Sequence, residues 1–257
     1  MTEGADERPL ARSVAARGRF ARIFALGDRT SPSSWTPGLI VSANDPEISL
    51  RFSAFRIERE SSTIPAKMSM EVLGDLCLPF GKPEIWNAEE GLILPSSLVE
   101  SDSGQKSIGS QLLPVSWQSL NHDEKLLEDS LEPSIVALID APQLAERPGK
   151  LVEALDAIRR RFPTSLIWTP GIGGPDNCAL LSWMGVDLFD FSRSQEAVAR
   201  GVILTEDGPR EPELTAGEVS DLQTQLEAWE RALGATRSAI REGTIRQLAE
   251  RQALSSP

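Results

Sequence analysis

The stretch SLIWTPGIGGPDNCALLSWMGVDLFD, residues 165–190, decides the fold of this chain. The apolar run Leu166–Trp168 has the length of a buried strand, and a loop with three glycines follows it. A helical apolar face then continues to Gly185, a usual helix stop, and Val186–Phe189 predicts the next strand, which ends at Asp190. Two strands joined by a helix predict a parallel βαβ unit. In a barrel of such units, the glycine loop and Asp190 would lie at the carboxyl ends of the strands, where active sites lie.

The segments around this unit extend the same pattern. Residues 134–140, SIVALID, are apolar on both faces, as parallel strands are, and they too end in an acid, Asp140. We expect this strand to neighbour 166–168 and 186–189, with helices over 151–162 and 175–184 packed outside. A long helix over 219–252, interrupted at Gly243, follows from apolar residues at three- and four-residue spacing.

The first half of the chain gives weaker signals. Short strands are predicted at 20–25 and 39–41, and alternation over 48–57 indicates a further strand or strand pair. The charged and small residues 1–16 predict a flexible tail, and 17–254 a single domain. A short strand at 202–204, followed by a turn at Glu206–Gly208, is expected beyond the central unit.

Composition limits the function. The 257 residues carry 26 basic and 38 acidic side chains, a net charge of −12, which argues against strong nucleic-acid binding by the chain alone. The run Arg159–Arg161 is expected to be a solvated helix face. Cys77 and Cys178 are too few for a disulfide framework and predict buried or inert thiols. No apolar run is long enough to span a membrane, and the N-terminus lacks a signal-peptide core, so we expect a cytoplasmic protein.

Several motifs, in their order and spacing, resemble the tRNA-guanine transglycosylase superfamily, most closely its archaeosine synthase branch. GVDLFD at 185–190 is followed by ARGVILTEDG at 199–208, similar to the family's "ARGxxLTxDG", and by IREG at 240–243. Upstream, residues 18–23 and TPGLI at 36–40 resemble its opening "ARxG…TPxL". The resemblance covers mainly residues 135–250. It implies a (β/α)8 barrel, with a trimmed or irregular first 130 residues.

The resemblance also implies an activity and residues that carry it. The substrate would be a 7-deazaguanine base at a D-loop position of tRNA, to which the archaeosine synthase branch adds lysine rather than exchanging the base. Asp190 matches the position of the family's nucleophile, and the loop with Gly171, Gly173 and Gly174 would approach the purine base through its backbone. Asp102, in Asp-Ser-Gly, is similar to the acid/base motif "DSGxFQ". Asp140 is an equally good second acid by position, whereas Asp187 is expected to be structural, through hydrogen bonds to loop backbone.

The expected metal ligands of the family are missing. Its zinc cluster of three cysteines and a histidine would fall between Thr205 and Trp229, where this chain has neither residue type, and His122 is the single histidine. We therefore expect no structural zinc and no cofactor. Two alternatives stay open, a non-catalytic subunit of such an enzyme and a barrel enzyme acting on a small free metabolite.

The acidic balance shapes the expected partners. We expect weak tRNA binding by the chain alone and a partner subunit or a homodimer, with no membrane. The apolar stripe of the 219–252 helix is a candidate docking face. The alternative is that this helix packs on its own barrel.

Overall fold

The computed structural model describes residues 12–27, 30, 32–42, 53–57, 112–117, 120, 133, 135–213 and 217–255. Within them, six strands form one parallel sheet in the order β5-β4-β9-β8-β7-β6. These strands are Ser53–Ile57 (β5), Gly38–Ser42 (β4), Leu188–Phe189 (β9), Leu166–Trp168 (β8), Ile135–Leu138 (β7) and Leu112–Val115 (β6). The chain is thus a mixed α/β protein, and the described residues do not form a closed barrel. Asp102, Cys77 and His122 lie outside the described residues.

The predicted central unit is confirmed. β7, β8 and β9 are parallel neighbours, with Ile135 opposite Leu166 and Trp168 opposite Leu188. The helix α6 (Pro148–Arg161) buries the stripe Leu151, Leu155 and Ile158 in the same core as these strands, and α7 (Cys178–Met184) adds Cys178 and Leu181 to it. Burial on both faces explains why the strands are apolar throughout.

The helix α7 begins at Cys178, three residues later than predicted. The preceding residues form a turn because Asn177 binds back into the loop: its Oδ1 accepts from Gly174 N at 2.8 Å, and its Nδ2 donates to the carbonyl of Ile172 at 2.9 Å. Gly185 ends the helix as predicted, with a φ of 110° that a residue with a Cβ rarely adopts.

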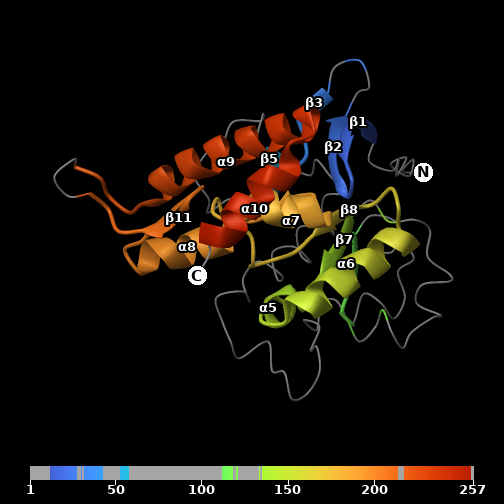
Figure 1. The fold of residues 1–257 in the computed structure, drawn as a ribbon, viewed down its shortest axis with the longest axis horizontal. Helices are drawn as coiled ribbons and strands as arrows, with labels where there is room; N and C mark the ends of the chain where they lie inside the picture. Colours follow the sequence, from blue (N-terminus) through green and yellow to red (C-terminus); the bar gives the residue numbers. More distant parts are fainter. Residues whose placement is uncertain are drawn as a thin grey trace, which may run out of the picture.

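The predicted long helix is confirmed as two helices, α9 (Leu222–Glu242) and α10 (Ile245–Ser255), separated at Gly243 with a φ of 74°. Asp221 caps α9 by accepting from Thr224 N at 2.7 Å. α9 is the longest helix and runs along the side of the molecule away from α6 and the short helix α5 (Ala141–Ala145) (Figure 1). Its apolar stripe, including Leu226, Trp229 and Leu233, is buried in the core of its own chain. The expectation that this stripe is a docking face is therefore wrong, and the helix packs on its own domain.

Three antiparallel strands form a separate sheet near the N-terminus: β1 (Arg12–Gly18), β2 (Ala21–Gly27) and β3 (Pro32–Trp35). β1 starts inside the segment 1–16 for which the sequence predicted a tail. The sequence missed this strand because the backbone pairing with β2 holds it, while its side chains lie partly or fully in solvent. Ala21 and Ile23 of β2 join a second core with Ala179 of α7 and with residues of α9 and α10.

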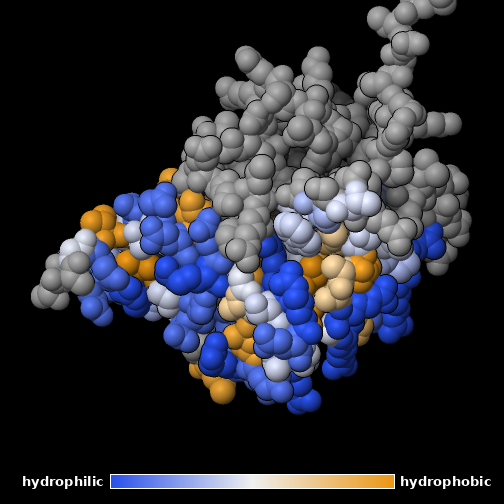
Figure 2. All heavy atoms as spheres, turned by 90° about the horizontal axis from the view of Figure 1, so that it is seen from above, coloured by the Kyte–Doolittle hydropathy of each residue, from blue (hydrophilic) through white to orange (hydrophobic). Residues whose placement is uncertain are grey.

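The remaining described elements lie along α9. The helix α8 (Ser192–Ala199) and the hairpin of β10 (Ile203–Thr205) with β11 (Gly208–Arg210) confirm the predicted strand and turn. In Figure 2, the described residues visible on one face are largely hydrophilic, with hydrophobic residues in small separate patches. No helix in the described residues is long and apolar enough to cross a lipid bilayer.

Candidate functional site at the carboxyl ends of the parallel strands

The carboxyl ends of β7, β8 and β9 place polar residues along one edge of the sheet, called the carboxyl edge below. Asp140 follows β7, Thr169 and the glycine loop follow β8, and Asp190 follows β9. The register of the three strands puts these positions side by side. Adjacent strands are about 4.8 Å apart. The strand before Asp140 (β7) and the strand before Asp190 (β9) are therefore about 10 Å apart, with β8 between them.

Asp190 is held in place by three N–H groups. Its Oδ2 accepts from Trp168 Nε1 at 3.1 Å and from Gly171 N at 3.0 Å, and its Oδ1 accepts from Ser192 N at 3.0 Å. The residue is only 4% exposed. The carboxylate therefore joins the glycine loop to the start of α8. The structure brings Asp190 and the loop together, and it gives Asp190 a structural task whatever else it does.

The three glycines of the loop each have a packing reason. Gly171 has a φ of 77° and donates its N–H to Asp190. A Cβ on Gly173 would lie 2.5 Å from Cδ1 of Phe189, and a Cβ on Gly174 would lie 2.6 Å from an Arg193 guanidinium nitrogen and overlap Asp176 Oδ1. Glycine is thus required here by the close approach of the chain's own side chains. Contact of this loop with a substrate base stays a prediction.

The pair of Asp176 and Arg193 was missed by sequence reasoning. Two hydrogen bonds of 2.6 and 2.5 Å join the guanidinium to the carboxylate, which is buried. The pair fixes the turn after the glycine loop to α8, across 17 residues of sequence. The sequence does not indicate that these two residues pair, because they are far apart in the chain and neither belongs to a repeating pattern.

Asp140 differs from Asp190 because one of its oxygens is unengaged. Its Oδ2 accepts from Trp117 N at 2.9 Å, whereas its buried Oδ1 has no hydrogen-bond partner among the described residues. Its side chain does not cap the helix α5 that starts after it. Burial raises the pKa of this carboxyl above its ordinary value, and the backbone amides of Trp117 and of Asp140 itself only partly oppose the rise. An acid with these properties is suited to give and take a proton.

Two more oxygens near these strand ends are buried without a partner in the described part of the chain. They are Thr169 Oγ1, directly after β8, and Gln143 Oε1, in α5 three residues after Asp140. Buried polar atoms are almost always hydrogen-bonded in proteins, so the partner of these oxygens is a group outside the described residues, a water molecule or a ligand. Sequence reasoning missed both residues, although each lies within three residues of a predicted strand end.

The opposite ends of the same strands, the amino edge below, carry an ionic cluster. Asp187, before β9, accepts from Ile167 N and from Arg159, both at 2.9 Å, and Arg22 lies 3.8 Å away. Asp187 is thus structural, as predicted, although it binds a strand amide rather than loop backbone. The expectation of a solvated face at Arg159–Arg161 is wrong for Arg159, which also donates to the carbonyls of Ser165 and Gly185.

The segment between Thr205 and Trp229, where the resemblance placed the zinc ligands, contains an ion pair. Arg210 donates to Glu218 through two hydrogen bonds of 2.5 and 2.7 Å, and the Arg210 bond lowers the pKa of Glu218 to about 2. Among the described residues, no group of three or more histidine, cysteine, aspartate and glutamate side chains could hold a metal ion. Cys178 is buried as predicted, and burial raises the pKa of its thiol to about 12.

The fold and this edge define a mixed α/β protein whose polar site lies at the carboxyl ends of a parallel sheet. Comparison with models of known protein families finds no match, and no curated protein matches the sequence.

Proposed function

We propose that this chain is a tRNA-modification protein of the archaeosine synthase/tRNA-guanine transglycosylase type, acting on a 7-deazaguanine base in tRNA. The observation that carries the proposal is the carboxyl edge itself. There, Asp140 has a raised pKa and a buried oxygen with no partner among the described residues, beside a glycine loop held by Asp190. Acceptor oxygens without partners suit a base whose ring edge presents N–H donors.

The strand order supports a barrel of the (β/α)8 type. Along the sheet, β4 pairs with β5, β6 with β7, β7 with β8 and β8 with β9, all in chain order, and β9 pairs back with β4. A sheet whose last described parallel strand pairs with its first has the cyclic order of a closed barrel.

The motifs that carry the family resemblance also meet in space. TPGLI at 36–40 includes the start of β4, which pairs with β9 in the GVDLFD segment. Arg237, a few residues before IREG, donates to the carbonyls of Trp35 and Pro37 at 2.7 and 2.6 Å. Contacts between segments some 200 residues apart support a common origin for the motif set more strongly than any motif does alone.

The hydrogen bonds of Asp190 favour the lysine-adding branch. Three N–H donors occupy the oxygens of its carboxylate, which leaves them poorly placed to attack C1′ as the nucleophile of a base-exchange enzyme must. In lysine addition the base stays on its ribose, and no carboxylate has to attack C1′. In this proposal Asp140 moves the proton and Asp190 positions the loop.

The three hydrogen bonds that hold Asp190 in a structural role also favour a second candidate function. In it, the chain is a non-catalytic subunit whose barrel assists a catalytic partner. The net charge of −12 suits either candidate, because phosphate contacts need basic side chains and weak tRNA binding by the chain alone is expected. A partner subunit or a second copy would then supply most of the tRNA affinity.

The test is single-turnover transfer of labelled lysine to tRNA that carries the 7-deazaguanine base, with and without candidate partner subunits. Asp140→Asn should slow transfer by about 100-fold or more, as expected for loss of a general acid or base. Asp156→Asn, at a partly exposed acid on α6, is the matched control and should leave the rate unchanged.

Three outcomes separate the candidates. Transfer that survives in Asp140→Asn at the full rate supports the non-catalytic subunit. Failure to bind the free 7-deazaguanine nucleobase in equilibrium dialysis rejects both candidates and favours an enzyme of a small free metabolite. Tight tRNA binding by the isolated chain at physiological salt, in a filter assay, contradicts the need for a partner.

A further inference from the structure

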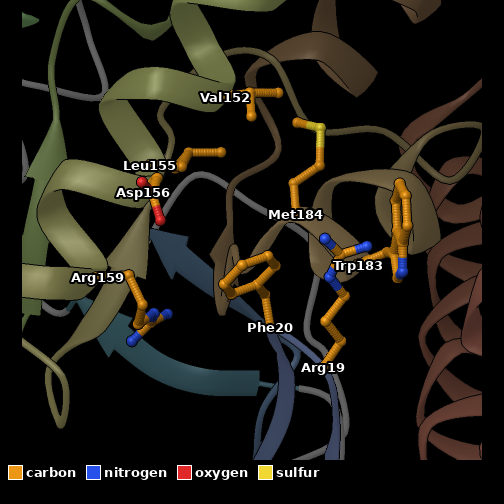
Figure 3. Close-up of a pocket in the computed structure, with 8 residues that line it drawn as sticks. All are labelled: Arg19, Phe20, Val152, Leu155, Asp156, Arg159, Trp183 and Met184. Carbon is orange, nitrogen blue, oxygen red and sulfur yellow. The ribbon is translucent and has the colours of Figure 1, made fainter.

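A cavity of about 150 Å³ lies at the amino edge of the sheet, away from the site described above. The turn between β1 and β2 forms one side of it, and α6 and the end of α7 form the others (Figure 3). Arg159 lies in the cavity wall and fixes the position of the cavity. It donates hydrogen bonds to the carbonyls of Ser165 and Gly185, which precede β8 and β9. We propose that this cavity binds a small aromatic carboxylate, with the ring inside and the carboxylate on Arg19.

The size and lining of the cavity suit one aromatic ring. A cavity of about 150 Å³ is large enough to hold benzene. The apolar lining comes from Phe20, Val152, Leu155, Trp183 and Met184. Phe20 and Val152 are 39% and 48% exposed, so two large apolar side chains are left partly in water at the mouth. A bound ring would cover them and stack against aromatic neighbours.

The charges around the cavity favour an anion. Arg159 is engaged with Asp187, and Asp156 is paired with Arg160 at 2.7 Å. The guanidinium of Arg19 lies over the rings of Phe20 and Trp183, 5.2 and 5.8 Å from their centroids, and no carboxylate among the described residues pairs with it. A cation fixed between two rings at an apolar mouth matches a ligand that has a ring and a carboxylate.

The backbone conformation of Arg19 supports a role of its side chain in ligand binding. β1 and β2 are joined by the two-residue turn Arg19–Phe20, and Arg19 has a φ of 59°. It is the one residue other than glycine with a positive φ in the described part of the chain. Glycine and asparagine adopt this conformation with less strain, so the turn alone would favour either of them. The arginine is held there by its two ring contacts, which aim the guanidinium at the mouth.

The experiment is a ¹⁹F NMR titration of the full chain with 4-fluorophenylacetate, and in parallel with 4-fluorophenylacetamide. The two probes share a ring and differ in charge. The acid should bind roughly tenfold more tightly than the amide, as one charge-assisted contact would give. Equal affinity of the two probes, or no binding of the acid at millimolar concentration, would overturn the proposal.

Variants locate the binding. Arg19→Asn should weaken binding of the acid by roughly tenfold and leave the thermal unfolding midpoint unchanged or raised, because asparagine tolerates the turn. Arg17→Gln is the matched control on the same hairpin, exposed and outside the cavity, and should bind like the unchanged chain. An equal loss in Arg17→Gln would show that only general charge is involved and would overturn the assignment.

A second copy of the chain is the rival occupant. Val152→Trp fills the mouth and should abolish binding of both probes, with no change in mass by light scattering. If the unchanged chain instead dimerises with rising concentration and Val152→Trp is monomeric, the cavity belongs to a dimer interface and the proposal fails. The cavity lies at the opposite edge from Asp140, so none of these results bears on lysine transfer.

Discussion

Two aspartates at the two ends of β9 have opposite surroundings. Asp187, before the strand, is held by the guanidinium of Arg159, with Arg22 close by. Asp190, after the strand, is held by three neutral N–H groups. Both are buried, and only three positions separate them. At the two ends of β9, Asp187 is thus bound by charged donors and Asp190 by neutral ones, while the ion pair of Asp176 and Arg193 lies on the carboxyl side, after the glycine loop.

Six buried side-chain atoms lack a hydrogen-bond partner among the described residues, and all but Ser182 Oγ, in α7, divide in the same way. At the amino edge they are donors, Arg22 Nε and Arg159 Nε, on side chains whose other nitrogens are engaged. At the carboxyl edge they are the oxygens of Asp140, Thr169 and Gln143. The amino edge therefore stabilises the sheet through charge pairing, whereas three acceptor oxygens at the carboxyl edge have no partner within the described part of the chain. This division agrees with the general placement of chemistry at the carboxyl ends of parallel strands.

The largest effect is expected from Asp187→Asn. The change leaves Arg159 and Arg22 without their carboxylate partner in a buried position, and breaking such a pair costs about 3–5 kcal/mol. The free energy of unfolding, from urea denaturation, should fall by about that amount. Asp156→Asn on α6, which breaks the exposed pair with Arg160, is the control and should change it by less than about 1 kcal/mol. Equal losses in the two variants would remove the claimed role of the amino edge.

Asp190→Asn should have the next largest effect. The amide keeps one acceptor oxygen, and its NH₂ group then faces N–H donors that have lost their partner. Unsatisfied buried groups of this kind cost about 1–3 kcal/mol. Urea denaturation measures the loss, and hydrogen exchange of the Gly171 amide should accelerate, because that amide donates to Asp190. Unchanged stability would mean that Asp190 is not needed to hold the loop, and would strengthen its candidacy as a nucleophile.

The difference between the two edges also explains which elements and which site residues could be predicted from the sequence. Strands β7, β8 and β9 and helices α6 and α9 follow from apolar periodicity, which depends on local spacing, and their predictions are confirmed. Asp140 and Asp190 were identifiable as the acids that follow two such strands. The sequence could not show which of the two acids has an oxygen without a partner in the described part of the chain, because that depends on Trp117 N and Gly171 N, 23 and 19 residues away in the sequence.

The failures have the same physical origin. Arg159 looked like part of a solvated basic run, and only the packing of α6 beside Asp187 shows that it is bonded to two carbonyls and a carboxylate. Strand β1 lacks an apolar pattern, because its backbone pairs with β2 while its side chains lie largely outside the core. Predictions from one sequence thus miss interactions that tertiary contacts create.

A smaller effect, of opposite sign, is expected from Thr169→Val. The Thr169 hydroxyl is fully buried, and its oxygen lacks a hydrogen-bond partner in the described part of the chain. Valine has the same shape without the polar atom, so the free energy of unfolding should stay level or rise by up to about 1 kcal/mol. A loss above about 1 kcal/mol would show that the hydroxyl is bonded, and would weaken the claim that the carboxyl edge keeps polar atoms available.

The smallest effect is a change in pH dependence from Asp140→Asn. Burial raises the pKa of Asp140 in the folded chain above its unfolded value, so the folded state binds the proton more tightly. The stability that this proton adds is fully present below the unfolded pKa and is lost as pH rises through the folded pKa. Asp140→Asn should therefore flatten the stability profile in that window and leave stability at pH 7 level or slightly higher. Urea denaturation from acid to neutral pH measures this, with Asp156→Asn as a control that keeps the slope. A variant that loses stability at pH 7 would mean that the Asp140 carboxylate is satisfied in the folded chain, and the two acids of the carboxyl edge would then be alike.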